Sequence, residues 1–124
     1  MKAHTILFVK DQQKSTKFYS EVLKLNPILN VPGMTEFQLS ESLILGLMPV
    51  EGAKKILGTP FFSSTTNAPS SELYLRLENF EDYFSRALEN GAKEISPILK
   101  RNWGDTAGYI SDPDNHIIAF SSLK

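Results

Sequence analysis

The order of secondary structure predicted for the first half of this 124-residue chain recurs in its second half. Each half begins with a strand rich in β-branched and aromatic residues, continues with a helix, and ends with three short strands. The first half has a predicted strand at 3–10, a helix at about 12–23, and strands near 27–31, 34–40 and 43–48. The second half has a predicted strand at 72–77, a helix from 80 to about 89, and strands near 93–99, 106–111 and 116–121. Two such β-α-β-β-β units place the chain in the α+β class.

The two predicted helices differ in how clearly the sequence specifies them. The second has apolar residues at the i, i+3, i+4, i+7 and i+8 spacing of a packed helix face, which are Phe80, Tyr83, Phe84, Ala87 and Leu88. Asn79 is its expected N-cap, and Asn90-Gly91 supplies a stop signal. The first helix has Asp11 as a plausible N-cap, but Gln12 and Thr16 make its first turn unusually polar for a packed face.

We expect a single domain over residues 1–124 that consists of two modules, at about 1–50 and 72–124. The segment between them, about 51–71, is rich in Gly, Ser, Thr, Pro and Asn and is typical of a linker. Its adjacent Phe61 and Phe62 are expected to pack on another part of the protein, and the sequence does not define their roles. If the helix of each module covers one sheet face, the free faces can come together as a curved, barrel-like cleft with the helices outside.

Composition restricts the partners. A net charge of -1 and 22% charged residues give no broad attraction for nucleic acid or anionic lipid. The chain has no cysteine, so any metal site would need histidine or carboxylate ligands. There is no apolar stretch of membrane-spanning length and no signal-peptide pattern at the first residues, so we expect a cytoplasmic location.

Two segments carry a resemblance to a known family. Residues 4–11 (HTILFVKD), followed by Phe18-Tyr19, are similar to the opening strand and helix of the vicinal oxygen chelate superfamily, which includes glyoxalase I, bleomycin resistance proteins and extradiol dioxygenases. Residues 108–115 (GYISDPDN), which run into an apolar strand, resemble the closing hairpin of that superfamily. The strand at 72–77 and the Asn102-Trp103-Gly104 segment look closest to the bleomycin-resistance branch. That resemblance implies a metal-free homodimer that sequesters an aromatic, cationic drug.

The glyoxalase branch implies a divalent metal held by one side chain from each of four strands. His4 matches the first ligand position and Glu72 the third, whereas the second lies at or near Gly46 and the fourth lies on Ala119. Neither glycine nor alanine can bind a metal, and His116 should face away from Ala119 because side chains alternate along a strand. Because a catalytic ion generally needs about three protein ligands, we predict no metal site and no cofactor, with a divalent metal as the alternative.

Strand alternation also predicts a ligand site. If His4 points into the cleft then Ile6 and Phe8 do so as well, and Tyr74 and Arg76 follow Glu72. The predicted ligand-binding residues, with Trp103 as a stacking face, are His4, Phe8, Glu72, Tyr74, Arg76 and Trp103.

Each of these residues also has a structural interpretation. His4 is more typical of a hydrogen-bonded strand histidine, and Glu72 is as well explained by a pair with Arg76. Trp103 is more typical of a core or dimer contact than of a ligand platform. The segment Asp112-Pro113-Asp114-Asn115 is typical of a turn.

The leading hypothesis is a metal-independent, homodimeric protein that binds a small, partly aromatic molecule for drug or metabolite sequestration. The alternative is a lyase, isomerase or dioxygenase of the same superfamily that uses a divalent metal or Glu72 as a base. A purely structural or regulatory dimer is a third class. The sequence does not identify the ligand, and it does not decide whether the modules pair within one chain or across a dimer.

Overall fold

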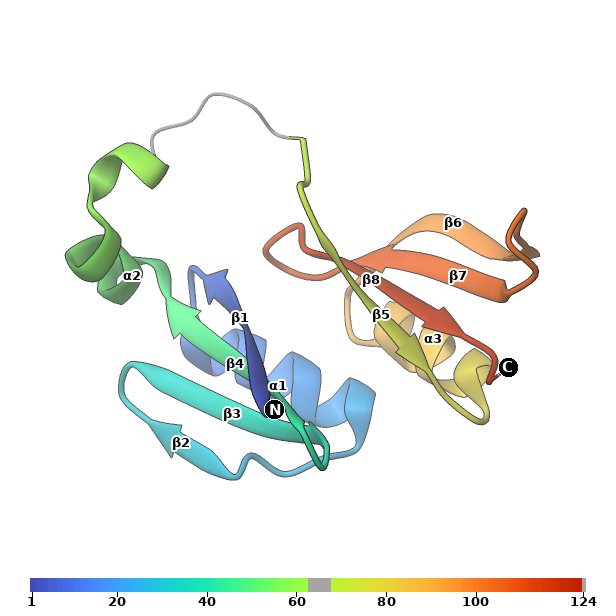
Figure 1. Ribbon diagram of the computed structural model, residues 1–124, viewed down its shortest axis with the longest axis horizontal. Helices are drawn as coiled ribbons and strands as arrows, with labels where there is room; N and C mark the ends of the chain where they lie inside the picture. The colour runs from blue at the N-terminus through green and yellow to red at the C-terminus, as the bar shows by residue number, and fades with distance from the viewer. Residues whose placement is uncertain (63–67, 124) are drawn as a thin grey trace. The chain divides into compact units, whose positions relative to one another are not determined.

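The computed structural model describes residues 1–62 and 68–123. The chain divides into two compact units, Met1–Asn67 and Ala68–Lys124, and each contains one four-stranded mixed sheet (Figure 1). Each unit also follows the predicted β-α-β-β-β order. The α+β class and the repeated architecture are therefore confirmed.

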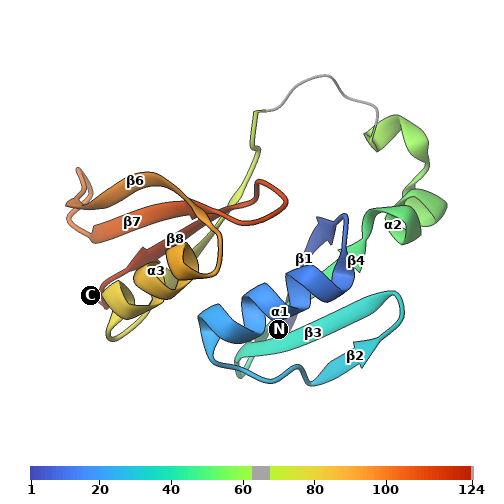
Figure 2. The same cartoon turned by 180° about the vertical axis from the view of Figure 1, so that it is seen from behind.

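Unit 1 begins with the strand, helix and three strands expected from the sequence. They are β1 (Ala3–Val9), α1 (Gln12–Leu23), β2 (Leu29–Val31), β3 (Met34–Ser40) and β4 (Leu43–Pro49). The strand order is β1-β4-β3-β2, with β1 parallel to β4 and the remaining pairs antiparallel. Helix α1 lies against one face of this sheet and packs on β3 and β4 (Figure 2).

The polar first turn of α1 has a structural purpose. Asp11 caps the helix, because its carboxylate accepts a hydrogen bond from Lys14 N at 3.1 Å. The Gln12 amide donates to Val31 O and to Thr35 Oγ1 and accepts from Gly33 N, while Thr16 Oγ1 donates to Thr35 Oγ1. These bonds fasten the β2–β3 hairpin to the helix, so side chains that look unsuited to a packed face satisfy the buried Thr35 hydroxyl.

The sheet of unit 1 has one covered and one open face. The face toward α1 carries fully buried residues, which include Val9, Thr35, Phe37, Leu45 and Leu47. The strand register places the alternate residues together on the other side. This open face of unit 1 carries His4, Ile6, Phe8, Met34, Glu36, Ile44, Gly46 and Met48. Ile6 is 38% exposed there.

The segment after β4 differs from the linker predicted for residues 51–71. It contains α2 (Val50–Leu57) and a short 3-10 helix, η1 (Thr59–Phe62). Helix α2 packs on β1 and β4 and buries Ala53, and it ends at Gly58, whose φ of 89° suits a residue without a side chain. The prediction of a linker was based on composition, and Gly52 and Gly58 contributed to it, so this short amphipathic helix was missed. Residues 63–67 of the predicted linker lie outside the described residues.

The two adjacent phenylalanines of this segment behave differently. Phe62 packs on Phe8, with ring centroids 5.6 Å apart, as expected for a packing residue. Phe61 is 77% exposed. The expectation that both rings pack is therefore correct for Phe62 and wrong for Phe61.

Unit 2 repeats the arrangement. Its elements are β5 (Glu72–Arg76), α3 (Phe80–Glu89), β6 (Lys93–Lys100), β7 (Thr106–Ser111) and β8 (Ile117–Ser121). The strand order is β5-β8-β7-β6, with β5 parallel to β8, and α3 packs on β6, β7 and β8. The face toward α3 buries Ile110, Ile118 and Phe120. The open face of unit 2 carries Glu72, Tyr74, Arg76, Tyr109, Ile117, Ala119 and Ser121.

Two local predictions in unit 2 have different outcomes. Asn79 precedes α3 but makes no side-chain cap, since it adopts a left-handed conformation with φ 53° and only its backbone oxygen accepts from Asp82 N. The turn after β7 is confirmed, because Asp112 Oδ1 accepts from both Asp114 N and His116 N at 2.8 Å. This is the Asx type of bonding that such turns use.

Candidate functional site

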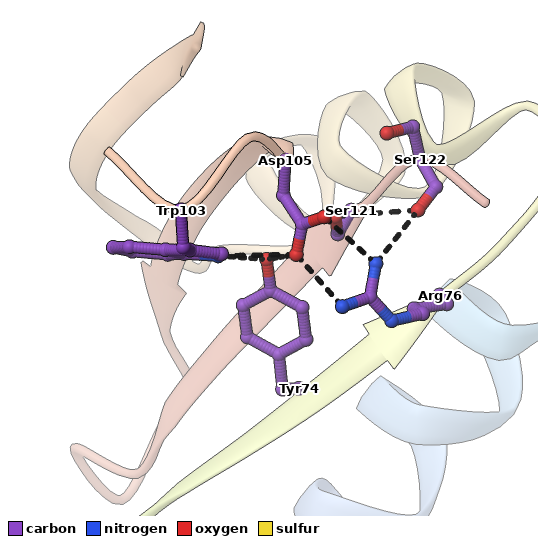
Figure 3. A network of polar contacts seen from close by, with 6 residues as sticks. All are labelled: Tyr74, Arg76, Trp103, Asp105, Ser121 and Ser122. Carbon is purple, nitrogen blue, oxygen red and sulfur yellow. Dashed lines mark hydrogen bonds and ion pairs between the residues drawn. The ribbon is translucent and has the colours of Figure 1, made fainter. Parts of the chain in front are cut away.

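A polar cluster lies at one end of the open face of unit 2. Strand β5 supplies Tyr74 and Arg76, and the loop between β6 and β7 supplies Trp103 and Asp105 (Figure 3). The loop is tightly closed, because Arg101 N donates to Asp105 O at 2.7 Å and Gly104 N donates to Arg101 O at 3.0 Å. This closure brings Trp103 and Asp105 over β5.

Asp105 is the common acceptor of the cluster. Arg76 donates to it through both terminal nitrogens, Nη1 to Oδ1 at 3.0 Å and Nη2 to Oδ2 at 2.8 Å. Tyr74 Oη donates to Oδ2 at 2.7 Å, and Trp103 Nε1 donates to the same oxygen at 3.0 Å. Asp105 is only 5% exposed, so these donors replace the water that would otherwise solvate its charge.

The cluster corrects one interpretation of the sequence. Arg76 pairs with Asp105 and not with Glu72. Asp105 was absent from the predicted site because it precedes β7 and the charge pattern along β5 gives no sign of it. The register of the strands does indicate that Asp105 lies near Arg76. Ser121 pairs with Arg76 on one side and with Ala107 on the other. Asp105 comes two residues before Ala107 and therefore lies on the same side of the sheet.

The electrostatics of the pair follow from its hydrogen bonds. The Arg76 guanidinium, followed by the Tyr74 hydroxyl, lowers the pKa of Asp105 to about 2. The pKa of Arg76 is raised in turn, first by its hydrogen bond with Asp105. Both groups are therefore charged at neutral pH, and each neutralises the other.

Acid titration provides a test of this pair. Because its pKa is below the ordinary value of about 3.9, ionised Asp105 stabilises the folded state above about pH 4, and this contribution is lost as the pH falls toward 2. The single tryptophan gives one indole N–H resonance, which reports on the oxygen it binds. We expect this resonance to titrate with a midpoint near 2 in the wild type and to show no such step in Asp105→Asn. A midpoint near 4 would contradict the ion pair.

Trp103 is presented to solvent and is not a core residue. Its ring is 59% exposed, while Nε1 is held by Asp105 and lies 3.3 Å from Tyr74 Oη. An exposed indole fixed at one edge keeps its orientation without being covered. This arrangement leaves a face on which a flat ligand can stack.

Glu72 is exposed on this face and makes no ion pair or hydrogen bond with another residue in the part of the chain that the structure describes. It lies near Tyr109, whose pKa is raised first by burial of the phenol and second by the Glu72 charge. The Arg101 guanidinium lies 5.0 Å from the centroid of the Tyr109 ring. Arg101 donates through Nε and Nη2 to Ser96 Oγ, Pro97 O and Ala107 O, so it supports the loop.

The other two predicted site residues, His4 and Phe8, lie in unit 1. His4 Nδ1 lies 3.3 Å from Glu36 Oε2, a contact that the sequence did not suggest because Glu36 comes from β3, two strands away from β1. Phe8 contacts Phe62. The structure thus groups Glu72, Tyr74, Arg76 and Trp103 in one unit, and His4 and Phe8 in the other.

The metal site of the glyoxalase branch does not fit these residues. A side chain at Gly46 would place its Cβ 3.1 Å from Ile6 Cγ1 and 3.3 Å from Met34 Sδ, so apolar groups fill the second ligand position. Ala119, at the fourth position, is fully buried and has no donor atom. Within the described part of either unit, no group of three His, Asp or Glu residues could hold an ion.

A cavity of about 380 Å³ in unit 1 contains none of the predicted site residues. It is lined by Gln12, Gln13, Thr16, Lys17, Asn30, Val31 and Pro32. Gln12 and Thr16 are already engaged in fastening the β2–β3 hairpin. We assign the cavity to the packing of that hairpin.

None of the helices in the described residues is long and apolar enough to cross a membrane. The expected homodimer and cytoplasmic location stay predictions.

Comparison with solved structures agrees with the fold. A glyoxalase-related enzyme from Fulvimarina pelagi superposes with a TM-score of 0.83 at 22% identity, over 99% of this chain and 88% of that one. A glyoxalase/bleomycin resistance protein/dioxygenase family enzyme from Burkholderia phytofirmans PsJN gives 0.83 at 17% identity, over 98% and 97%. An integron cassette protein from V. cholerae gives 0.69 at 22% identity, over 100% and 95%. These identities establish the fold alone.

No protein of curated function matches the chain. The model of the glyoxalase-like domain family, in contrast, matches residues 2–123. That match spans both units and includes the polar cluster around Asp105. The chain therefore belongs to the glyoxalase-like domain family, within the vicinal oxygen chelate superfamily.

Proposed function

We propose that this protein binds a small aromatic cation, without a metal, on the open face of unit 2. The observation that carries the proposal is the exposed Trp103 ring, held in place by a buried carboxylate and accompanied by a carboxylate that no described residue neutralises. Such a site suits sequestration of a drug or metabolite, because it offers contact surface and charge but no group poised for covalent chemistry.

The preference for a cation follows from the charges. Asp105 and Arg76 neutralise each other through a bidentate pair, and Arg101 donates to backbone and hydroxyl oxygens. Glu72 is exposed and has no such donor among the described residues. A positively charged ligand would gain attraction to Glu72, and an anion would be repelled by it.

The preference for an aromatic ligand follows from the rings. Trp103, Tyr74 and Tyr109 are supplied by three separate elements; hydrogen bonds orient Trp103 and Tyr74, and the Arg101 guanidinium lies 5.0 Å from the centroid of the Tyr109 ring. Stacking on an indole whose edge is already bonded loses little side-chain entropy, because the side chain is ordered before the ligand arrives. A flat cation could also gain a cation–π contribution from the Trp103 face.

Binding of a matched series of quinoline compounds tests the proposal. The series contains N-methylquinolinium as the cation, quinoline as the neutral analogue and quinoline-4-carboxylate as the anion, each measured by calorimetry at neutral pH. We expect the cation to bind most tightly. Glu72→Gln should weaken the cation about fivefold and leave quinoline unchanged, since one exposed charge at contact distance contributes about 1 kcal/mol. Trp103→Ala should weaken both.

A matched control distinguishes binding at this site from nonspecific binding. Glu78→Gln removes a carboxylate of the same chemistry that lies after β5, outside the open face, and should not change the affinity for the cation. Equal affinity for all three compounds, or equal effects of Glu72→Gln and Glu78→Gln, would overturn the charge preference. The site itself would be wrong if Trp103→Ala bound every compound as well as the wild type.

A further inference from the structure

We propose that Asp105 is the specificity-determining residue of the Trp103 site. Its carboxylate fixes the orientation of the indole and, at the same time, hides the positive charge of Arg76 from a ligand. The ligand class rests on the proposed function. The inference goes beyond that function because it assigns the sign of charge that the site accepts to one buried residue that a ligand need not touch.

The donors around Trp103 converge on Asp105. Arg76 donates to the carboxylate through Nη1 at 3.0 Å and Nη2 at 2.8 Å, Tyr74 Oη donates at 2.7 Å, and Trp103 Nε1 donates at 3.0 Å. Because these hydrogens point at one carboxylate, they are not offered to a ligand. The cluster therefore presents rings rather than donors, which disfavours anions that need N–H or O–H groups.

Arg76 would be available to an anion if Asp105 did not hold it. The Arg76 side chain is 34% exposed, whereas that of Asp105 is 6% exposed. A guanidinium that is one-third exposed can contact a bound carboxylate or phosphate, and its fork of donors suits both groups. The buried carboxylate occupies that fork through two hydrogen bonds and cancels its charge at contact distance.

A purely structural role for Asp105 is the rival explanation. Asp105 also closes the loop between β6 and β7, since its backbone oxygen accepts from Arg101 N, and its side chain anchors that loop to β5. Loss of the anchor alone would loosen the loop and expose the indole of Trp103 equally to every small molecule. Uncovering the charge of Arg76 would instead change the approach of anions and cations in opposite directions.

Collisional quenching of the single tryptophan separates these explanations without any bound ligand. The quenchers are iodide, caesium and neutral acrylamide, each applied to the full chain at constant ionic strength. Asp105→Asn keeps the size of the side chain and uncovers one positive charge near the indole, so the ratio of the iodide to the caesium quenching constant should rise about twofold. Arg76→Gln uncovers the carboxylate instead, and the same ratio should fall. The double variant removes both charges and should return the ratio to the wild-type value.

The quinoline series supplies the ligand arm of the test. In Asp105→Asn, quinoline-4-carboxylate should gain affinity and N-methylquinolinium should lose it, whereas the double variant with Arg76→Gln should prefer the cation again. Asp82→Asn is the matched control, because it removes the same charge from α3, which packs on the covered face of the sheet. It should change neither the quenching ratio nor the affinities.

The two arms distinguish failure of the inference from failure of the proposed function. If the wild type binds none of the quinoline compounds while the quenching ratios change as expected, the proposed function is wrong and the masking of Arg76 stands. The masking is wrong if the ratio stays constant in Asp105→Asn while all three quenchers gain equally, or if Asp82→Asn shifts the ratio as much. Circular dichroism checks the fold of each variant. If Asp105→Asn does not fold, Arg76→Gln tests the same masking with the opposite sign, since Tyr74 and Trp103 still hold Asp105.

Discussion

Phe37→Ala is expected to lower the free energy of unfolding of unit 1 by about 3–5 kcal/mol. The Phe37 ring is fully buried on the face of β3 that lies against α1. Its removal would lose the transfer free energy of the ring and leave a cavity that the packed helix and sheet cannot fill completely. Urea unfolding followed by circular dichroism measures this loss.

Phe61→Ala is the matched control, because the same truncation is made at a ring that is 77% exposed. We expect its effect to stay within about 0.5 kcal/mol. Trp103 fluorescence reports on unit 2 separately, so it identifies which unit has been destabilised. Equal effects of the two substitutions would mean that β3 does not turn Phe37 toward α1, and the assignment of Glu36 to the open face would then fail as well.

Sequence alternation was sufficient to sort residues between the two faces of each sheet. Glu72, Tyr74 and Arg76 share the open face of unit 2, and His4 and Phe8 share that of unit 1, as their spacing predicted. The reason is physical: successive side chains of a strand point to opposite sides, so a pattern along one strand determines its faces. The 3.6-residue spacing of apolar residues likewise located α3, whereas α2 was not predicted.

The alternation of side chains along a strand could not predict which residues contact these side chains. Asp105 binds Arg76 across a sequence separation of 29 residues, and Glu36 meets His4 from a strand that is not adjacent to β1. Both contacts depend on the register between strands, and in unit 1 an irregularity of β3 shifts its register with β4. A single sequence contains no direct record of such a shift. The residues that alternation missed are therefore the two carboxylates, Asp105 and Glu36, that contact Arg76 and His4.

These carboxylates also change how the site residues are understood. Arg76 was predicted to bind the ligand, but its guanidinium is already engaged in a bidentate pair with Asp105. His4 matches a ligand position of the metal-binding branch, and its Nδ1 lies 3.3 Å from Glu36 Oε2.

Gly108→Ala is expected to destabilise unit 2 by about 1–3 kcal/mol, although it adds only one methyl group. A Cβ at Gly108 would lie 2.7 Å from both Phe84 Cε2 and Ile98 Cγ1, closer than packed atoms approach. Phe84 is buried between α3 and the sheet, so its ring cannot move away without displacing the helix. Thermal or urea unfolding followed by Trp103 fluorescence measures the effect directly in this unit.

Gly46→Ala is the matched control for Gly108→Ala, because it adds the same methyl group to a strand glycine that faces the open side of its sheet. Its Cβ would lie 3.1 Å from Ile6 Cγ1 and 3.3 Å from Met34 Sδ, and a shift of a few tenths of an ångström in these flexible side chains relieves both contacts. We therefore expect a loss within about 0.5 kcal/mol. A larger loss at Gly46 than at Gly108 would contradict the assignment of the helix-covered and open faces. The partial rescue of Gly108→Ala by Phe84→Leu, which shortens the obstructing side chain, should follow only if the contact with Phe84 causes the loss.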